Sequence, residues 1–317
     1  AWSTPGAALV ATTEGISMTQ AVGAFVVTGL LIAATGAVRP LGRAVAMIPD
    51  GIAGGMLAGV LLPFVLKGAG AAEAAPALVL PMLAVFALMR LWNPAVAVIA
   101  ALAAGLALAF SFGFAAWPAL TLPLPRLVFI SPEFDPGVIV GLALPLYLVT
   151  MASQNLPGFA TMRAAGYEPP VRPALAVTGG ISALTALFGA HTVSMAAITA
   201  AICLGPDVHP DRDQRWKVGL AYAGFWAALG LFSPAILRLL GALPPQVMVA
   251  LVALALLGAL TGALATAMAV PAQRFAAVLT LGITAAGVPF LGVGAAFWGL
   301  VAGISFFALE QLAQRRR

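Results

Sequence analysis

The chain has 317 residues, of which 62% are hydrophobic and 8% are charged, and its net charge of +5 comes from 15 basic and 10 acidic side chains. Soluble domains carry about 25% charged residues, so this composition excludes a soluble enzyme and a nucleic-acid-binding protein. The single cysteine, Cys203, excludes a disulfide framework and a cysteine-based metal cluster. The composition therefore predicts an all-α polytopic membrane protein.

Ten segments come close to the requirement of about 20 apolar residues for a helix that crosses a bilayer. They are residues 17–36, 44–66, 76–92, 94–113, 136–162, 173–188, 217–238, 244–266, 274–291 and 294–312. Two apolar segments, 1–14 and 189–204, are too short or too interrupted to be simple spans. Residues 114–135 are more polar and are predicted to form an external loop.

The basic residues predict the orientation, because Lys and Arg collect on the cytoplasmic side of membrane proteins. With Arg315–Arg317 in the cytoplasm, 12 of the 15 basic residues fall on that side, and Lys67, Arg126 and Arg238 remain outside. The sequence therefore predicts a multi-pass membrane protein with a cytoplasmic C-terminus.

The chain also contains an internal repeat. Residues 28–62 parallel residues 223–257, and residues 3–9 fall on residues 192–198. The spans of the two copies run in opposite directions by the predicted topology, which is typical of secondary transporters. A duplicated anion channel stays open as an alternative. The second copy begins near Pro136, so two further spans are expected before the first copy.

In inverted-repeat carriers the solute binds where helices are interrupted near the membrane midplane. Ser3–Ala7 has hydroxyl groups before a proline, which suits the first turn of a helix. Its repeat counterpart is Thr192–Met195, and free N–H groups at two such helix ends would attract an anion. The candidate substrate-binding residues here are Ser3, Thr4, Pro5, Gly6, Ala7, Thr192, Val193, Ser194 and Met195. An ordinary helix cap at the interface is the alternative.

Four further positions are candidates for the same site. His191 is the ionisable side chain predicted near the centre of the membrane, and we expect it to bind substrate and to carry or sense a proton. Gln154 and Asn155 interrupt an apolar span and can hydrogen-bond a carboxylate, or they can simply join helices. Phe159 is a candidate for packing on an aromatic ring. No metal or cofactor is expected, because the other histidine, His209, lies in a hydrophilic loop.

Four segments resemble a known family: AWSTPGAAL (1–9), MASQNLPGFATMRAAGY (151–167), FGAHTVSMAAITAAICLGPDVHPD (188–211) and GAAFWGLVAGI (294–304). Over essentially the whole chain the sequence resembles the benzoate/proton symporters, or benzoate membrane transport proteins. That family is similar in fold to uracil and xanthine permeases and to sulfate-type anion transporters. Ser194 departs from the family pattern, in which Asn is expected.

The resemblance implies a seven-plus-seven inverted-repeat fold with two short half-helices, of which the first two helices are absent from this chain. The implied core domain comprises residues 1–36 and 136–238, and the implied gate domain comprises residues 37–113 and 239–317. In the nucleobase permeases, acidic residues occupy the positions that fall near Gln154 and His191. An amide and an imidazole at these positions suit a carboxylate substrate, which a fixed carboxylate would repel.

The function implied is proton-coupled uptake of benzoate or a similar aromatic carboxylate by alternating access. The expected partners are that carboxylate, protons and the lipid bilayer, with no nucleic acid, and a homodimer is one open assembly. A carrier for another planar anion or a nucleobase, and an anion channel, remain alternatives. An enzyme is not expected, because the predicted spans contain no Ser/His/Asp set, acid pair or metal-ligand spacing.

Overall fold

The computed structural model describes residues 2–38, 47–118, 124–196, 199–200, 203–204, 208–288, 290–291 and 293–315. Within these ranges the regular structure is helical, as predicted, and extended pairing is limited to two isolated β-bridges, Trp2–Val193 and Phe290–Val293. Each of the ten predicted spans contains a helix.

Within the part of the chain that the structure describes, five helices are long and apolar enough to cross a membrane. They are α2 (Met18–Ala37), α4 (Asp50–Ala74), the helix that runs over Pro136–Arg163, α14 (Pro245–Ala269) and α16 (Ala295–Arg315). A sixth span results if the bent pair α12 (Lys217–Leu231) and α13 (Ser233–Gly241) is counted as one. The chain is therefore a polytopic membrane protein, and the seven-plus-seven arrangement stays a prediction.

The other helices are shorter. They are α1 (Thr4–Thr12), α5 (Pro76–Trp92), α6 (Ala97–Ser111), α10 (Val171–Ala186) and α15 (Arg274–Ala286). The last of these ends before the predicted boundary at residue 291, because Gly287 has a left-handed backbone (φ 67°) that closes the helix.

The helix over residues 136–163 is continuous but widens twice. It consists of α7 (Pro136–Val138), the π turn η1 (Ile139–Ala143), α8 (Leu144–Thr150), the π turn η2 (Met151–Asn155) and α9 (Leu156–Ala164). Pro145 and Pro157 each follow a π turn by two residues. A proline cannot donate to the carbonyl four residues earlier, and a π turn is one way to absorb that loss.

The predicted span 217–238 is bent. Its two halves, α12 and α13, meet at an angle of 62°. Pro234 cannot donate a hydrogen bond to the Gly230 carbonyl, and the Ser233 hydroxyl donates to that carbonyl instead, at 2.8 Å. Pro234, which lies inside an apolar run of the sequence, therefore breaks the helix.

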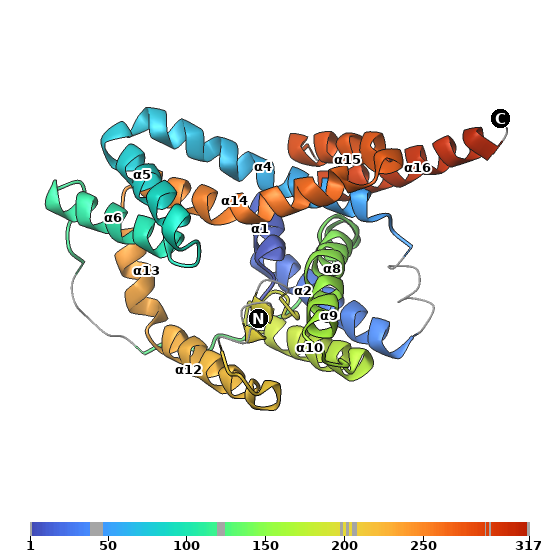
Figure 1. Cartoon of the computed structure of the whole chain (residues 1–317), viewed down its shortest axis with the longest axis horizontal. Coiled ribbons are helices and arrows are strands. Elements are labelled where there is room, and N and C mark those ends of the chain that lie inside the picture. The colour runs from blue at the N-terminus through green and yellow to red at the C-terminus, as the bar shows by residue number, and fades with distance from the viewer. Residues whose placement is uncertain are drawn as a thin grey trace. The chain divides into compact units, whose positions relative to one another are not determined.

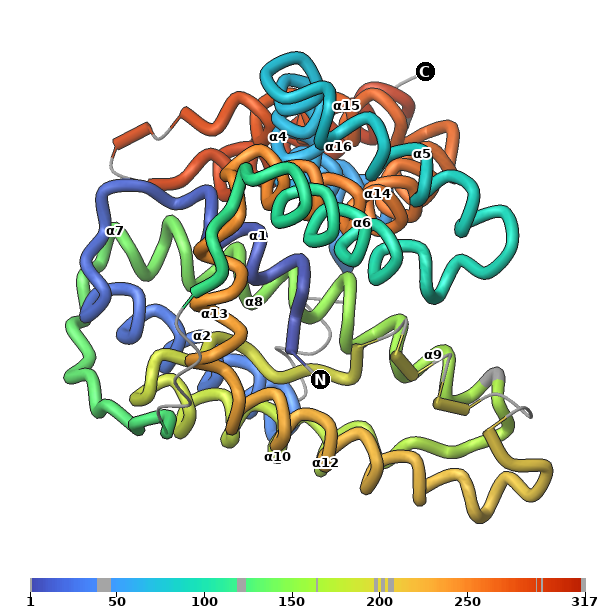
Figure 2. Tube along the Cα trace, turned by 90° about the vertical axis from the view of Figure 1, so that its left-hand side faces the viewer, coloured from blue at the N-terminus to red at the C-terminus, as the bar shows by residue number. Residues whose placement is uncertain are grey.

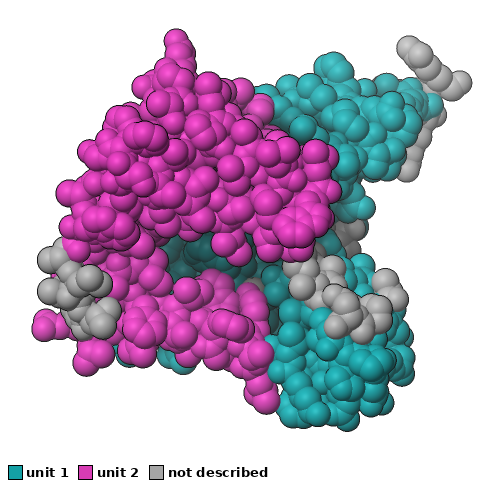
Figure 3. Space-filling model, turned by 60° about the vertical axis from the view of Figure 1, so that its left-hand side comes forward, with its two compact units in different colours: residues 1–61, 127–219, 262–317 teal, residues 62–126, 220–261 magenta. Residues whose placement is uncertain are grey.

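The chain divides into two compact units, coloured separately in Figure 3. Unit 1 comprises residues 1–61, 127–219 and 262–317, and unit 2 comprises residues 62–126 and 220–261. Unit 1 contains the predicted core segment 1–36 and most of the predicted core segment 136–238, whereas residues 220–238 of that segment belong to unit 2. Unit 1 also contains residues 37–61 and 262–317 of the predicted gate, and the core and gate division itself stays a prediction. One core cluster of unit 1 consists of Ile32, Tyr147, Met151, Phe159 and Leu175. One of unit 2 consists of Ala71, Leu78, Val79, Met82, Ala109, Leu243, Val247 and Ala250.

Within unit 1, α2 and α10 lie side by side (Figures 1 and 2). Their contact is between backbones: a Cβ atom on Gly179 would lie 2.3 Å from the Ala33 nitrogen and 2.6 Å from the Gly29 carbonyl oxygen. Reciprocally, a Cβ atom on Gly29 would lie 2.8 Å from the Gly179 oxygen. Such close approach is how small residues join membrane helices.

A second set of small residues lies on α4. A Cβ on Gly54 would meet α14 at Ala267 and Ala263, and one on Gly55 or Gly59 would meet α15 at Ala277 or Thr284. The glycine spacing of residues 51–59 therefore marks a helix-packing face.

We expect Gly179→Ala to lower the thermal stability of the protein in detergent. The new methyl group has no room against Ala33 and Gly29, and overpacking of this kind costs about 1–3 kcal/mol. The melting temperature of the purified protein measures the effect.

The matched control is Gly180→Ala on the same helix, where an added Cβ meets nothing within 4 Å. This change gains about 1 kcal/mol of helix propensity and should leave the melting temperature equal or higher. Equal destabilisation by both substitutions would contradict backbone contact between α2 and α10.

Candidate solute site

The first half of the predicted site is the start of α1. Ser3 caps the helix, because its hydroxyl oxygen accepts a hydrogen bond from the Gly6 N–H at 3.1 Å. Pro5 lies in the first turn, where its missing N–H is not needed. Ser3, Pro5 and Gly6 are buried, whereas Thr4 is exposed. The predicted helix start near Pro5 is therefore confirmed.

The second half is a non-helical stretch at residues 190–196, and Ala196 at its end has a left-handed backbone (φ 48°). Val193 forms an antiparallel bridge with Trp2, and the Ser3 N–H donates to the Thr192 carbonyl at 3.1 Å. Among the described residues, the first helical hydrogen bond after this stretch is at the Ala196 carbonyl, which accepts from the Ala200 N–H at 2.8 Å. Residues 197–198 and 201–202 lie outside the described residues.

The 190–196 stretch is held by side chains from two other helices. The Val193 N–H donates to the Ser182 hydroxyl at 2.8 Å, and the Met195 N–H donates to the Asn155 amide oxygen at 3.0 Å. Gly158 lets α9 come this close, because a Cβ there would lie 2.6 Å from the Met195 Cβ. Asn155 of the helix over residues 136–163 thus reaches the 190–196 stretch.

These bonds correct one expectation. The sequence suggested free N–H groups at Thr4–Ala7 and Thr192–Met195, yet Val193 and Met195 donate as above. Gly6 donates to the Ser3 side chain and Ala7 to the Ser3 carbonyl. Side-chain acceptors compete for backbone donors in this way, so side chains are left to recognise a solute.

His191 lies between two aromatic rings. Its ring centroid is 5.2 Å from that of Trp2, with an interplanar angle of 35°, and 6.4 Å from that of Phe25 on α2. Its Nδ1 lies 3.4 Å from the Thr192 hydroxyl. Its Nε2 is buried and has no hydrogen-bond partner in the described part of the chain. The arrangement is an imidazole with one nitrogen anchored and the other available.

Sequence reasoning missed Trp2 and Phe25 as parts of this site. Trp2 directly precedes the Ser-Thr-Pro-Gly motif, and that adjacency was the available signal. Phe25 is one of several bulky residues in an apolar span, so only the packing of α2 against the 190–196 stretch identifies it.

The remaining candidates are placed as follows. Gln154 donates to the neighbouring Ser153 hydroxyl at 3.5 Å, within the π turn η2. Ser194 is buried and engaged within the protein. Phe159 is 2% exposed and packs in the core cluster of unit 1 with Tyr147 and its neighbours. Asn155 therefore bonds the 190–196 stretch, whereas Phe159 is part of the core of unit 1.

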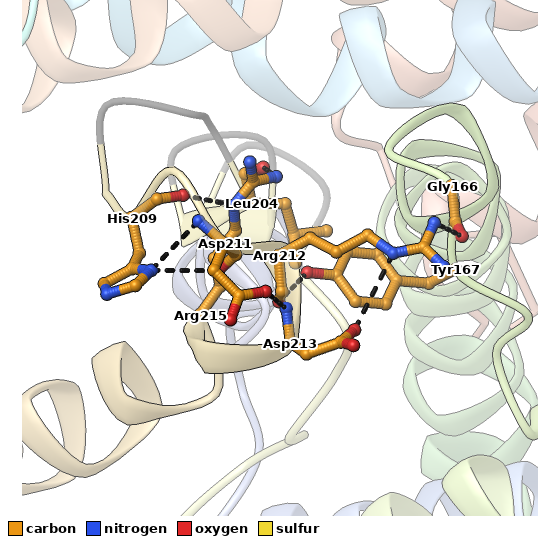
Figure 4. A network of polar contacts seen from close by, with 8 residues as sticks. All are labelled: Gly166, Tyr167, Leu204, His209, Asp211, Arg212, Asp213 and Arg215. Atoms are coloured by element: carbon orange, nitrogen blue, oxygen red, sulfur yellow. Dashed lines mark hydrogen bonds and ion pairs between the residues drawn. The ribbon is translucent and has the colours of Figure 1, made fainter.

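His209 belongs to a separate polar network (Figure 4). The Arg215 guanidinium donates to the carbonyls of His209, at 2.8 Å, and Leu204, at 2.6 Å. Arg212 donates to the Gly166 carbonyl at 2.8 Å and lies over the Tyr167 ring. These bonds fasten the hydrophilic loop to the end of α9. Among the described residues, no three His, Cys, Asp or Glu side chains are grouped to hold a metal ion.

Comparison with known proteins agrees with this architecture. The family model described as Benzoate membrane transport protein matches residues 1–309. Inner membrane protein YdcO of Escherichia coli is 40% identical over 319 residues, which cover 100% of this chain and 82% of that protein. The Benzoate membrane transport protein of Acinetobacter baylyi is 35% identical over 311 residues, which cover 98% of this chain and 79% of that protein.

The family match spans nearly the whole chain, the two relatives align along its length, and its long apolar helices are those of a multi-pass protein. The resemblance inferred from the four sequence segments is thereby confirmed. This chain belongs to the benzoate membrane transport protein (BenE) family, whose members are transporters of the bacterial inner membrane.

Proposed function

We propose that the protein takes up benzoate or a similar aromatic carboxylate together with a proton. The family and the named function of the Acinetobacter baylyi relative support the solute class. The observation that supports the site is His191, whose Nε2 is buried without a partner in the described part of the chain and whose ring lies against Trp2 and Phe25.

A buried polar nitrogen that lacks a hydrogen bond costs about 1–3 kcal/mol. A carboxylate beside Nε2 would supply that bond, and the bond would be stronger if the imidazole is charged. The aromatic ring of the solute would then lie near Trp2, which is 49% exposed and offers a face for stacking. One site would thus bind the carboxylate of benzoate through His191 and its ring through Trp2.

The α1 helix adds to the recognition of the carboxylate. Its N-terminus carries a partial positive charge, and Thr4 is exposed there with a hydroxyl that can donate. We assign the direct contacts to His191 and Thr4, with Ser194 beside them. Asn155 does not contact the solute: its amide oxygen accepts the Met195 N–H and so positions the stretch. Ser3 likewise caps the start of α1.

Proton coupling is assigned to His191, because imidazole changes its charge within the physiological pH range. A proton on His191 would neutralise the carboxylate and allow both to cross together. In the proposed cycle a core of residues 1–36 and 136–238 moves against a gate of residues 37–113 and 239–317, with the C-terminus in the cytoplasm.

The first experiment is uptake of labelled benzoate into proteoliposomes that contain the full-length protein, with and without an inward proton gradient. Uphill accumulation supports a carrier, whereas single-channel currents without accumulation would indicate an anion channel. Competition by unlabelled benzoate, uracil and sulfate tests the solute class. Stronger inhibition by uracil or sulfate than by unlabelled benzoate, or no uptake of labelled benzoate by folded protein, would overturn the assignment.

We expect His191→Gln to abolish gradient-driven accumulation and to weaken benzoate binding. Loss of a hydrogen bond to a charged group costs about 1.5–3 kcal/mol, which corresponds to roughly 10- to 100-fold in affinity. Uptake and binding of labelled benzoate measure the two effects.

The other histidine of the chain supplies the control. His209→Gln changes a half-buried residue of the polar loop, outside the candidate site, and should leave uptake within about twofold of the unchanged protein. Gradient-driven uptake that survives His191→Gln would place the proton site at another residue and keep the carrier.

We expect Trp2→Ala to raise KM for benzoate roughly 2- to 10-fold, because an aromatic pair contributes about 0.5–1.5 kcal/mol. Trp2→Phe retains a ring and should recover most of the affinity. Trp92→Ala is the control, since Trp92 is 82% exposed at the end of α5. An equal KM in Trp2→Ala and the unchanged protein would remove Trp2 from the site.

A further inference from the structure

The His191 ring is connected to a second buried hydroxyl that the site description has not used. The Thr192 hydroxyl lies 3.4 Å from His191 Nδ1 and 3.1 Å from the Thr150 hydroxyl. Thr150 is the last residue of α8 and is fully buried. The three side chains form a linear chain, from Thr150 through Thr192 to His191.

Thr150 differs from other threonines on these helices. The hydroxyls of Thr28, Thr161 and Thr178 each donate to the carbonyl four residues earlier, at 2.8, 2.9 and 2.8 Å. Thr150 makes no such bond in the described part of the chain, where its hydroxyl contacts Thr192 alone. A hydroxyl has one hydrogen to donate, and a buried donor left without an acceptor is unfavourable. By geometry either hydroxyl of this pair could be the donor, and the cost of an unpaired donor favours the arrangement in which the Thr150 hydrogen points at the Thr192 oxygen.

This direction fixes the rest of the chain. Because the Thr192 oxygen accepts from Thr150, its own hydrogen is free to point at His191 Nδ1, which then accepts. A neutral imidazole carries one hydrogen, so that hydrogen must be on Nε2. Nε2 is the nitrogen that is buried without a partner among the described residues.

We propose that Thr150 is a positioning residue that fixes the His191 tautomer through Thr192, so that the solute carboxylate meets an N–H group at Nε2. This inference rests on the proposed function for the role of the site, although the tautomer can be measured without transport. It also assigns Thr192 a role in orienting His191 and not in contacting the solute.

The surroundings of His191 contain few other titratable groups. The segments α1, α2, α8 and η2 carry no Asp, Glu, Lys, Arg or His. Tyr147 on α8 is occupied by a hydrogen bond with Thr35 at 2.5 Å. Arg163 lies in the last turn of α9 and Arg172 in the first turn of α10. Among these described neighbours, the Thr192 hydroxyl is thus the polar group that contacts the imidazole directly.

The test is a ¹⁵N NMR spectrum of the full-length protein in lipid nanodiscs, labelled at histidine, with His191→Gln used to assign the His191 signals. We expect a protonated Nε2 and an unprotonated Nδ1 at a pH at which His191 is neutral. Thr150→Val should remove this preference, and Thr150→Ser should keep it. A hydrogen on Nδ1 in the unchanged protein, or no change in Thr150→Val, would overturn the proposal.

Uptake gives an independent readout. Thr150→Val removes the bond between Thr150 and Thr192, so the Thr192 hydroxyl no longer has to direct its hydrogen at His191 Nδ1. A proton on Nδ1 is then less disfavoured, and the pH profile of uptake should move up by roughly half a unit to one unit. KM for benzoate should rise, and Thr150→Ser should restore both. The control is Thr28→Val, which is equally buried but is bonded to the Ala24 and Ala143 carbonyls, and it should leave the pH profile unchanged.

Two outcomes separate this proposal from the proposed function. If the unchanged protein fails to transport benzoate but shows the Nε2 tautomer and its loss in Thr150→Val, the solute assignment is wrong and the hydroxyl chain stands. If benzoate is transported while the tautomer and the pH profile are the same in Thr150→Val as in the unchanged protein, the positioning role is wrong. Should Thr150→Val fail to fold, Thr192→Val breaks the same chain and should remove the same preference.

Discussion

The conformation around the candidate site depends on one constraint: each buried backbone N–H group needs a hydrogen-bond acceptor. A membrane offers no water to an unpaired backbone group, yet residues 191–195 are not helical and need acceptors from elsewhere for their N–H groups. The protein supplies acceptors from two other helical segments: the Ser182 hydroxyl on α10 accepts from Val193, and the Asn155 amide oxygen in the π turn η2 accepts from Met195. The stretch in turn accepts from the Ser3 N–H through the Thr192 carbonyl. The stretch that holds His191 therefore depends on α10, on η2 and on the residue that caps α1.

Close packing makes those bonds geometrically attainable. Gly29 and Gly179 bring α2 and α10 into backbone contact, and Gly158 brings α9 against Met195. Pro145 and Pro157 accompany π turns, and the second of these turns contains Asn155 itself. Residues that look like helix breakers in a list of apolar segments are, in the folded protein, the residues that let polar side chains reach an interrupted backbone.

The chemistry of the candidate site follows from which groups are already occupied. Two helix ends with bare N–H groups would bind an anion by themselves, but the described donors at Gly6, Ala7, Val193 and Met195 are bonded within the chain. Recognition of the solute therefore depends on side chains and not on these backbone N–H groups. The imidazole of His191 then becomes the natural centre of the site, because one of its nitrogens is anchored by Thr192 while the other is buried and unbonded within the described structure.

The sequence by itself determined the class of protein, the helical segments, the start of α1 and the family, because apolar length, capping residues and motifs are local properties of the chain. It also selected His191 and Asn155, since polar groups in apolar spans stand out. Only the tertiary structure decided the bend before α13, the non-helical form of Thr192–Met195, the core position of Phe159 and the aromatic neighbours of His191. Each of these depends on which group, tens of residues away along the chain, accepts a hydrogen bond or fills a neighbouring volume. Local sequence patterns do not encode that choice.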